Sequence, residues 1–403
     1  MADDVTSRAY AQQLDADDPL AGFRERFVVD DEGPIYVDGN SLGRLPHATA
    51  ERLTALVQDW GTRLVSGWPD WIELPAQVGD LLAEHVLNAR EGEVIVCDSV
   101  TVNLFKLAGA VLQQELGPLV GLEDDFPTDR YVLEGLAERH GVELRLTDRD
   151  GLQQAMQGAR LAVLSHVDYR SGEILGFDAV DGLVLWDLSH AAGAIEIDLS
   201  GRQLAVGCTY KYLNGGPGAP AFLYVRKDLQ EHLRSPIQGW FGQREQFAMG
   251  PAYDPAPGIE RFLAGTPPIL ELTAVRSGVE LTAEAGMAQI AEKTRKLTDL
   301  FVALHDAWLA PLGFTLASPR DATTRGGHVS LAHPDGWQIC RALIERANVV
   351  PDFRRAGGGG LVRFGLPALY TRYADVYEAA KRTEDLVALG AHREIKAPPA
   401  RVT

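Results

Sequence analysis

Lys211 is the lysine whose surroundings most suggest a catalytic role. It lies between two tyrosines and is followed by a glycine-rich turn. A lysine of ordinary pKa is protonated at neutral pH, so a lysine that forms a Schiff base must lie where its free amine is favoured. The turn at residues 214–218 (NGGPG) lets the backbone approach a small ligand closely. On this residue alone, an ordinary solvated surface lysine remains the alternative.

A carboxylate precedes this lysine at the end of an apolar, strand-like stretch, where Asp187 follows Trp186. Pyridoxal phosphate needs a carboxylate beside its ring nitrogen, because the protonated ring accepts the electrons left when a bond to the substrate's α-carbon breaks. An aspartate after a strand is also a common cap of a helix or turn. Taken together, Lys211 and Asp187 predict a pyridoxal phosphate enzyme.

An anion site is expected where a short apolar strand near residues 94–97 leads into a helix that begins at Asn103. Val100 and Thr101 lie just before that expected helix. Backbone N–H groups and a hydroxyl at a helix N-terminus bind phosphate readily. A plain Ser/Thr helix cap is the alternative interpretation.

Two further motifs contain groups suited to a flat cofactor. Phe126 offers an aromatic face for stacking, with Asp129 nearby, although the same run is compatible with a turn before a helix. His190 follows Asp187 by three residues, and we expect it to form a hydrogen bond with the cofactor or with Asp187. The alternative is a histidine whose hydrogen bonds serve only the structure. No pair of His or Cys residues has the spacing of a zinc site, so we expect no metal.

Composition excludes several classes of partner. The chain has 403 residues, with 38 Lys and Arg against 56 Asp and Glu, and the net charge of −18 argues against nucleic acid and anionic membranes. Its N-terminus is acidic and lacks the pattern of a signal segment, and no run of 18 apolar residues is present. Three widely spaced cysteines, Cys97, Cys208 and Cys340, fit a reducing compartment. We therefore expect a cytoplasmic protein.

The order of apolar runs predicts an α/β fold with a mostly parallel sheet flanked by helices on both faces. Short strand-like runs alternate with helical patterns from residue 93 to residue 225, and ligands of such sheets sit at the carboxyl ends of the strands. A long helix is expected over residues 269–309 with an interruption near Gly286, followed by a smaller α+β unit. The loop at 235–268 is long enough to be functional, and the four glycines at 357–360 indicate a flexible hairpin loop.

Three parts of the chain follow from these patterns. Residues 1–50 form an N-terminal helical arm and a segment that joins the small domain, and residues 51–285 form the large cofactor-binding domain. The small C-terminal domain covers residues 286–403.

The motifs resemble those of the kynureninase family of fold-type-I pyridoxal phosphate enzymes, and the resemblance extends from about Ala21 to about Leu389. The runs that carry it are 36–43 (YVDGNSLG), 101–104 (TVNL), 126–129 (FPTD), 186–193 (WDLSHAAG), 210–218 (YKYLNGGPG), 239–242 (GWFG), 363–365 (RFG) and 369–372 (LYTR). The departure from the family pattern is the run of four glycines before the RFG motif.

The resemblance implies a role for each matching residue. Lys211 holds the cofactor's aldehyde and is the catalytic base, Asp187 pairs with the ring nitrogen, and Tyr210 binds phosphate or assists proton movements. The remaining cofactor-binding positions implied are Val100, Thr101, Phe126, Asp129, Ser165 and His190, with Trp240 and Thr266 reaching the phosphate from the neighbouring subunit of a homodimer. The substrate-binding positions implied are Arg363 for the substrate carboxylate and Asn40, Ser41 and Trp68 for its aryl end.

The family's reaction is the hydrolysis of L-kynurenine to anthranilate and L-alanine, in tryptophan catabolism. Trp68 and Thr266 are similar to the bacterial pattern, which favours kynurenine over its 3-hydroxy derivative. The competing hypothesis is another fold-type-I enzyme, either an aminotransferase or a cysteine desulfurase-like lyase. A desulfurase needs a mobile nucleophilic cysteine, whereas Cys97, Cys208 and Cys340 lie in strand-like or helical runs suited to burial. A binding protein on a retained enzyme scaffold is disfavoured because Lys211 and Asp187 are both present.

Overall fold

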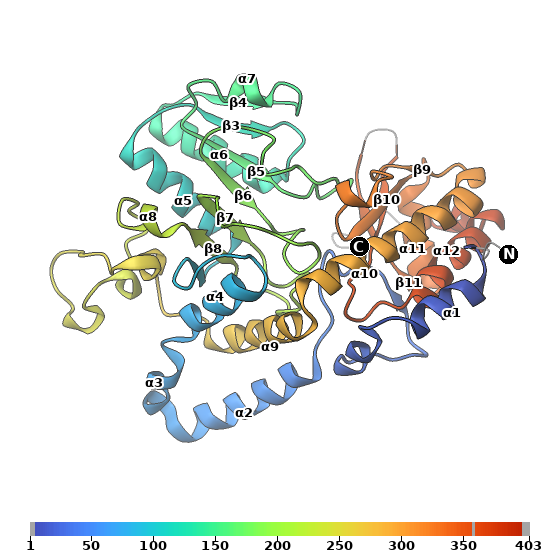
Figure 1. Cartoon of the computed structure of the whole chain (residues 1–403), viewed down its shortest axis with the longest axis horizontal. Helices are drawn as coiled ribbons and strands as arrows, with labels where there is room; N and C mark the ends of the chain where they lie inside the picture. The colour runs from blue at the N-terminus through green and yellow to red at the C-terminus, as the bar shows by residue number, and fades with distance from the viewer. Residues whose placement is uncertain (1–4, 357–358, 397–403) are drawn as a thin grey trace.

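A computed structural model describes residues 5–356 and 359–396, and Figure 1 shows two lobes joined by long helices. One lobe is built on a seven-stranded sheet. The other is built on a four-stranded antiparallel sheet and a two-stranded parallel pair. Both sheets have helices packed against them, so the predicted α/β large unit and α+β small unit are confirmed.

The large sheet is mostly parallel. In spatial order its strands are β2 (Val94–Val96), β8 (Phe222–Val225), β7 (Leu204–Gly207), β6 (Val184–Asp187), β5 (Leu161–Ser165), β3 (Leu119–Leu122) and β4 (Leu144–Thr147). Only β8 runs against its neighbours. Most of these strands are continuous apolar runs, as expected for strands that are buried on both faces.

Helices cover both faces of this sheet. Alternate strand residues enter two separate hydrophobic clusters, one shared with α4 (Leu74–His85) and α9 (Ile269–Ala285). The other cluster is shared with α5 (Val100–Gln114) and α6 (Pro127–His140). The remaining helices of this lobe are α2 (His47–Arg63), α3 (Trp68–Trp71), α7 (Leu152–Ala155) and α8 (Lys227–Gln230). This double covering leaves the carboxyl ends of the parallel strands as the place for a ligand.

The small lobe combines both ends of the chain. Its sheet has the order β12 (Asp352–Arg354), β13 (Leu361–Gly365), β10 (His328–Ala332) and β9 (Thr315–Leu316), and β1 (Ile35–Tyr36) pairs with β11 (Val349–Val350). Its helices are α1 (Arg8–Ala16), α10 (Met287–Leu304), α11 (Gly336–Arg346) and α12 (Tyr373–Ala388). Because α1 packs on α12 and β1 pairs with β11, the N-terminal segment belongs with this lobe.

Some predicted boundaries differ from the observed ones. The helix expected to begin at Asn103 begins at Val100, because the side chain of Ser99 caps it by accepting a hydrogen bond from the N–H of Val102 (3.3 Å). The interruption of the long helix at Gly286 is confirmed, and this glycine has a φ of 78°, which favours glycine. Of the four-glycine loop, residues 357 and 358 lie outside the described residues. Among the described residues, no helix is both long enough and apolar enough to span a membrane.

Candidate active site

A cavity of about 240 Å³ lies where β6 and β7 end and α5 begins. It is lined by Ser99, Val100, Thr101, Phe126, Thr128, Asp129, Asp187, Ser189, His190, Cys208, Tyr210, Lys211, Ala219 and Ala221. Most of the cofactor-binding residues expected from the sequence therefore meet in one place. We call this space the cofactor cavity.

The amine of Lys211 is buried in the cofactor cavity, next to the imidazole of His190. The lysine side chain is only 8% exposed, and Nζ lies 3.2 Å from Nε2 and 3.4 Å from Nδ1 of His190. Burial, and then the positive charge of Lys211, lower the pKa of His190 well below its ordinary value. The imidazole beside the amine is therefore neutral at pH 7.

The N-terminal segment fixes the backbone of this lysine. The N–H of Gly43 donates to the carbonyl of Tyr210 (2.8 Å), and any side chain at position 43 would collide with the carbonyl oxygen of Lys211. Only glycine permits this close approach. The run at 36–43, one of those that carry the family resemblance, therefore packs directly against Lys211.

Two carboxyl groups share the opposite side of the cavity. Asp187, at the end of β6, accepts hydrogen bonds at Oδ1 from the N–H (2.8 Å) and the hydroxyl (2.5 Å) of Ser189. Neither oxygen of the buried Asp129 has a hydrogen-bond partner among the described residues. Burial, and then the nearby charge of Asp187, raise the pKa of Asp129 well above its ordinary value, and burial raises the pKa of Asp187. A protonated ring nitrogen would place a further positive charge beside this pair, in addition to that of Lys211.

The first turn of α5 lines another side of the cofactor cavity and is suited to an anion such as a phosphate. The N–H groups of Val100 and Thr101 lie in that turn, where helix geometry provides no intrahelical acceptor. The aligned peptide dipoles favour an anion at this end. With Lys211 for the aldehyde, the carboxyl pair for the ring nitrogen and Phe126 for the ring face, the residues present fit pyridoxal phosphate.

Three predicted cofactor residues lie outside the lining of this cavity. Ser165 ends β5, next to Asp187 in register, and its N–H donates to Oδ2 of Asp125 (2.9 Å). Trp240 is exposed and packs edge-on against Phe241, with ring centroids 4.4 Å apart. Thr266 is exposed as well. Within a single chain, neither Trp240 nor Thr266 lines the cofactor cavity.

The predicted substrate arginine lies on the small lobe, facing the large one. Val362 and Phe364 are buried in the core of the small lobe, so strand alternation turns Arg363 to the other face of β13. Its guanidinium is 1% exposed and forms an ion pair with the buried Asp352, while Nη1 donates to the carbonyl of Tyr169. Burial lowers the pKa of Arg363 to about 10, so it remains charged at neutral pH.

The residues next to Arg363 come from the N-terminal segment and from β10. Ser41 donates to Oδ2 of Asp352 (3.2 Å) and accepts a longer bond from Nη2 of Arg363 (3.4 Å). Asn40 is fully buried, and its amide group has no partner among the described residues. The ring of His328 lies 5.9 Å from that of His190 and connects this cluster to the cofactor cavity. We call Asn40, Ser41, Asp352 and Arg363 the carboxylate cluster.

Trp68 lies apart from that cluster. It begins α3 and contacts Trp71 and Phe241, with ring centroids 5.9 Å and 6.3 Å away. Asn40 and Ser41 are thus brought next to Arg363, whereas Trp68 is brought next to the segment that carries Trp240.

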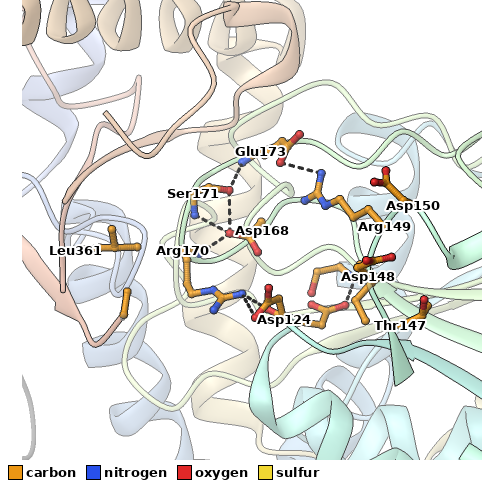
Figure 2. Close-up of a pocket in the computed structure, with 14 residues that line it drawn as sticks. Asp124, Thr147, Asp148, Arg149, Asp150, Asp168, Arg170, Ser171, Glu173 and Leu361 are labelled. Atoms are coloured by element: carbon orange, nitrogen blue, oxygen red, sulfur yellow. Dashed lines mark hydrogen bonds and ion pairs between the residues drawn. The ribbon is translucent and has the colours of Figure 1, made fainter. Parts of the chain in front are cut away.

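A larger cavity of about 480 Å³ lies beside the first, at the ends of β3, β4 and β5 (Figure 2). Its lining includes six acidic residues and two arginines, and each arginine is paired with an acid. Arg149 pairs with Glu173 and Arg170 with Asp124, both at 2.9 Å. We call this space the acidic cavity, and no lysine lines it.

The three cysteines are unsuited to nucleophilic chemistry. Cys97, Cys208 and Cys340 are all buried. Burial raises the pKa of Cys97 to about 11 and that of Cys340 to about 12, and it also raises the pKa of Cys208. In residues 5–356 and 359–396, no group of three or more His, Cys, Asp or Glu side chains is arranged to hold a metal ion.

Several residues of the site were not singled out from the sequence. Ser189 lies inside a motif that was noted, and its place two residues after Asp187 is the local signal for its hydrogen bond. Asp352 pairs with Arg363 across two strands, and Tyr169 approaches it from the other lobe. Both contacts depend on tertiary structure, so sequence spacing gave no signal for them.

The chain matches two family models. One is described as the kynureninase C-terminal domain and matches residues 290–383, and the other is described as aminotransferase class-V and matches residues 136–336. Among solved structures, the apo cysteine desulfurase from Thermococcus onnurineus NA1 superposes with a TM-score of 0.78 at 18% identity, covering 91% of this chain and 98% of that one. A C-DES mutant with glycine covalently linked to its PLP cofactor also gives a TM-score of 0.78, at 17% identity, covering 90% and 99%. These structural matches establish the shared fold.

Full-length relatives are much closer in sequence. The kynureninase of Burkholderia pseudomallei (strain K96243) is 41% identical over 405 residues, which cover 95% of this chain and 96% of that protein. The kynureninase of Pseudomonas fluorescens is 40% identical over 399 residues, covering 94% of each. This level of identity over nearly the whole length shows that the chain belongs to the kynureninase family of fold-type-I pyridoxal phosphate enzymes.

Proposed function

We propose that this protein hydrolyses L-kynurenine to anthranilate and L-alanine with pyridoxal phosphate as cofactor, as a step of tryptophan catabolism. The observation that carries the proposal is the cofactor cavity, where a buried lysine faces a pair of buried carboxyl groups and a helix N-terminus. Membership of the kynureninase family supports the choice of substrate.

When bound, pyridoxal phosphate supplies an aldehyde that links to amino groups and a protonated ring that takes up electrons from the substrate's α-carbon. Asp187 holds the proton on the ring nitrogen, with Asp129 beside it. Lys211 acts as the general base, since its Nζ removes the α-proton of the substrate and returns a proton to the α-carbon when L-alanine is formed. The neutral His190 next to this amine adds no competing positive charge at pH 7.

The bond changes balance with one water molecule. Water adds to the carbonyl carbon of the aryl ketone, the Cβ–Cγ bond breaks, and the aryl fragment leaves as anthranilate. The β-carbon takes a proton, which gives L-alanine. Tyr210 lines the cavity beside Lys211, where its hydroxyl is placed to assist these proton transfers. Its alternative role is that of a phosphate ligand alone.

Arg363 binds the substrate's α-carboxylate, because a buried guanidinium offers several N–H donors to a carboxylate. Asn40 is fully buried with an unpaired amide, which supports a role in holding the substrate. Ser41 lies within hydrogen-bond distance of the arginine. These residues, with Trp68, line the substrate site.

The active enzyme is a homodimer in which Trp240 and Thr266 reach the neighbouring cofactor cavity. Both residues are exposed in the single chain. The 17-residue helix α2 buries only Thr49. Large apolar side chains are exposed on α2 and just after it (Val57, Trp60, Leu64 and Val65) and in the loop that carries Trp240 (Phe247 and Met249), where a partner would cover them. An exposed apolar surface of this kind is typical of a protein interface.

The proposal also includes a cellular location and a division of the chain into domains. The three unpaired, buried cysteines are compatible with a reducing environment, which supports the cytoplasm as the location. The domains are residues 1–50 and 286–403 for the small unit and 51–285 for the large one. The division is supported by the break at Gly286, since α9 packs on α4 and α2, whereas α10 packs on α12.

The direct test is to supply L-kynurenine and 3-hydroxykynurenine in parallel to the holoenzyme and to follow the release of anthranilate from the first and of 3-hydroxyanthranilate from the second. We expect turnover of both, with kynurenine preferred. Absence of anthranilate release with bound cofactor would overturn the proposal. Sulfide release from cysteine would instead point to the desulfurase alternative, which the burial of all three cysteines disfavours.

A further inference from the structure

A single buried carboxylate, Asp352, connects two arginines on the face of the small lobe that carries the carboxylate cluster. It lies directly opposite Arg363 on neighbouring antiparallel strands and is 0% exposed. Its Oδ2 accepts from Nη2 of Arg363 and from the hydroxyl of Ser41, and its Oδ1 accepts from Nη1 of Arg354 (2.7 Å). Both of its oxygens are therefore occupied by protein donors.

These contacts fix the guanidinium of Arg363. A free arginine side chain has many rotamers, and holding it in one of them has an entropic cost. Asp352 accepts a hydrogen bond from Nη2 of Arg363, and the carbonyl of Tyr169 accepts one from Nη1. A planar guanidinium held at two points has a defined orientation.

Donors remain free for a ligand. A guanidinium has five N–H bonds, and the contacts of Arg363 within the described residues are with Asp352, Ser41 and the carbonyl of Tyr169. Its Nε has no acceptor among those residues. The N–H of Nε and the second N–H of Nη1 are therefore the donors left for a substrate carboxylate while Asp352 keeps its place.

We propose that Asp352 is a positioning residue, which fixes the orientation of Arg363 for the substrate's α-carboxylate while touching no substrate atom itself. The inference rests on the proposed function insofar as that function assigns the α-carboxylate to Arg363. Arg354 supports the same arrangement from the other side, because it binds the second oxygen of Asp352.

The test compares two small amines that differ in the carboxylate, L-alanine and ethylamine. Their dissociation constants are measured by titrating the cofactor absorbance of the holoenzyme, so kynurenine turnover is not required. In Asp352→Asn we expect affinity for L-alanine to fall by roughly 10- to 100-fold, the effect of losing one hydrogen bond to a charged group, with ethylamine unchanged. With kynurenine, KM should rise by a similar factor while kcat changes little.

Asp299→Asn is the matched control. It removes a carboxylate that pairs at 2.5 Å with Arg325, a fully buried arginine elsewhere in the small lobe, and should leave both affinities unchanged. If Asp352→Asn fails to fold, Arg354→Gln takes its place. That variant removes only the outer partner of Asp352, and we expect a smaller loss of L-alanine affinity, of a few fold.

Two results would overturn the inference. One is an unchanged ratio of L-alanine to ethylamine affinity in Asp352→Asn, or in Arg354→Gln where that variant stands in. The other is an equal weakening of both ligands, which indicates a structural role alone. Arg363→Gln separates this failure from that of the proposed function: if it abolishes the preference for L-alanine and Asp352→Asn does not, Arg363 keeps its role and Asp352 loses its own.

Discussion

The two cavities at the carboxyl edge of the large sheet differ in how their charges are satisfied. The acidic cavity is the larger, at about 480 Å³ against about 240 Å³, yet its arginines are paired with neighbouring acids. The cofactor cavity instead holds a carboxyl group, Asp129, whose oxygens have no partner among the described residues, and a lysine whose near neighbour is a neutral histidine.

This difference shows which of the two spaces is built for a ligand. A buried polar group without a partner costs free energy, so its persistence indicates that something else completes it. In the acidic cavity, by contrast, both arginines are paired with partly exposed acids, and no described lining residue has a buried polar atom without a partner. Cavity volume alone would have pointed to the wrong place.

Replacing the lysine should have the largest effect. In Lys211→Ala the amine that holds the cofactor and moves the α-proton is lost, so we expect kcat to fall by at least roughly 10³-fold. Lys227→Ala, which changes an exposed lysine, is the control. Steady-state assay of anthranilate release measures both, and similar activities in the two variants would contradict the assignment.

The next largest effect should come from the carboxyl pair. Asp187→Asn removes the charge that holds the ring nitrogen protonated, and we expect a fall in kcat of roughly 10²-fold or more. Asp124→Asn, in the acidic cavity, should change kcat by less than about twofold, because its charge serves only an exposed ion pair. Equal losses in the two variants would remove the distinction between the cavities.

A substitution at Tyr210 tests whether this residue takes part in proton transfer as well as in binding the phosphate. Tyr210→Phe removes one hydroxyl, and we expect kcat to fall by roughly 10- to 100-fold, with a much smaller change in the dissociation constant of pyridoxal phosphate. Single-turnover rates and cofactor titration measure the two quantities. Equal losses would leave only the role of phosphate ligand.

An unsatisfied carboxyl also predicts a pH effect on stability. Burial raises the pKa of Asp38 to about 6, and its Oδ1 has no partner within the described residues. Between the unfolded pKa of about 3.9 and pH 6 the native state binds more protons, so its stability falls as pH rises through this window. Relative to Asp38→Asn, the wild type should lose roughly 1 kcal/mol between pH 5.0 and pH 7.5.

Thermal unfolding of both proteins at the two pH values measures this double difference. A difference in Tm that is the same at pH 5.0 and pH 7.5 would show that Asp38 does not titrate in that range. A shift of the opposite sign would mean that its carboxylate is stabilised, as in an ion pair.

The smallest effect is expected within the acidic cavity. Glu173→Gln breaks the surface ion pair with Arg149, and exposed pairs contribute about 0 to 1 kcal/mol. We expect a change in the free energy of unfolding below about 0.5 kcal/mol and an unchanged KM for kynurenine. A large rise in KM would show that this cavity binds substrate after all.

Local patterns were enough to predict much of this molecule. The strands of the large sheet are short apolar runs, and Gly286 marks the break between α9 and α10. Asp187 was found because it lies at the end of such a run, and Lys211 because it lies between two tyrosines and before a glycine-rich turn. The alternation of Val362, Arg363 and Phe364 along β13 explains why the arginine faces away from the core of the small lobe.

Contacts between segments that are distant in the chain could not be predicted from the sequence. Asp352 opposes Arg363 only through strand register, and Gly43 meets the carbonyl of Lys211 only after the N-terminal segment crosses to the large lobe. The start of α5 was misplaced because Ser99 was not recognised as the cap. In each case the deciding partner is set by tertiary packing or by one side-chain hydrogen bond.

The most direct test of the central claim is to locate the covalent attachment of the cofactor. The holoenzyme is reduced with borohydride, digested, and mapped by mass spectrometry. The account predicts a single modified lysine, Lys211. Modification of a different buried lysine, such as Lys106 with its partner Asp98, or of no lysine in protein that retains the cofactor, would contradict it.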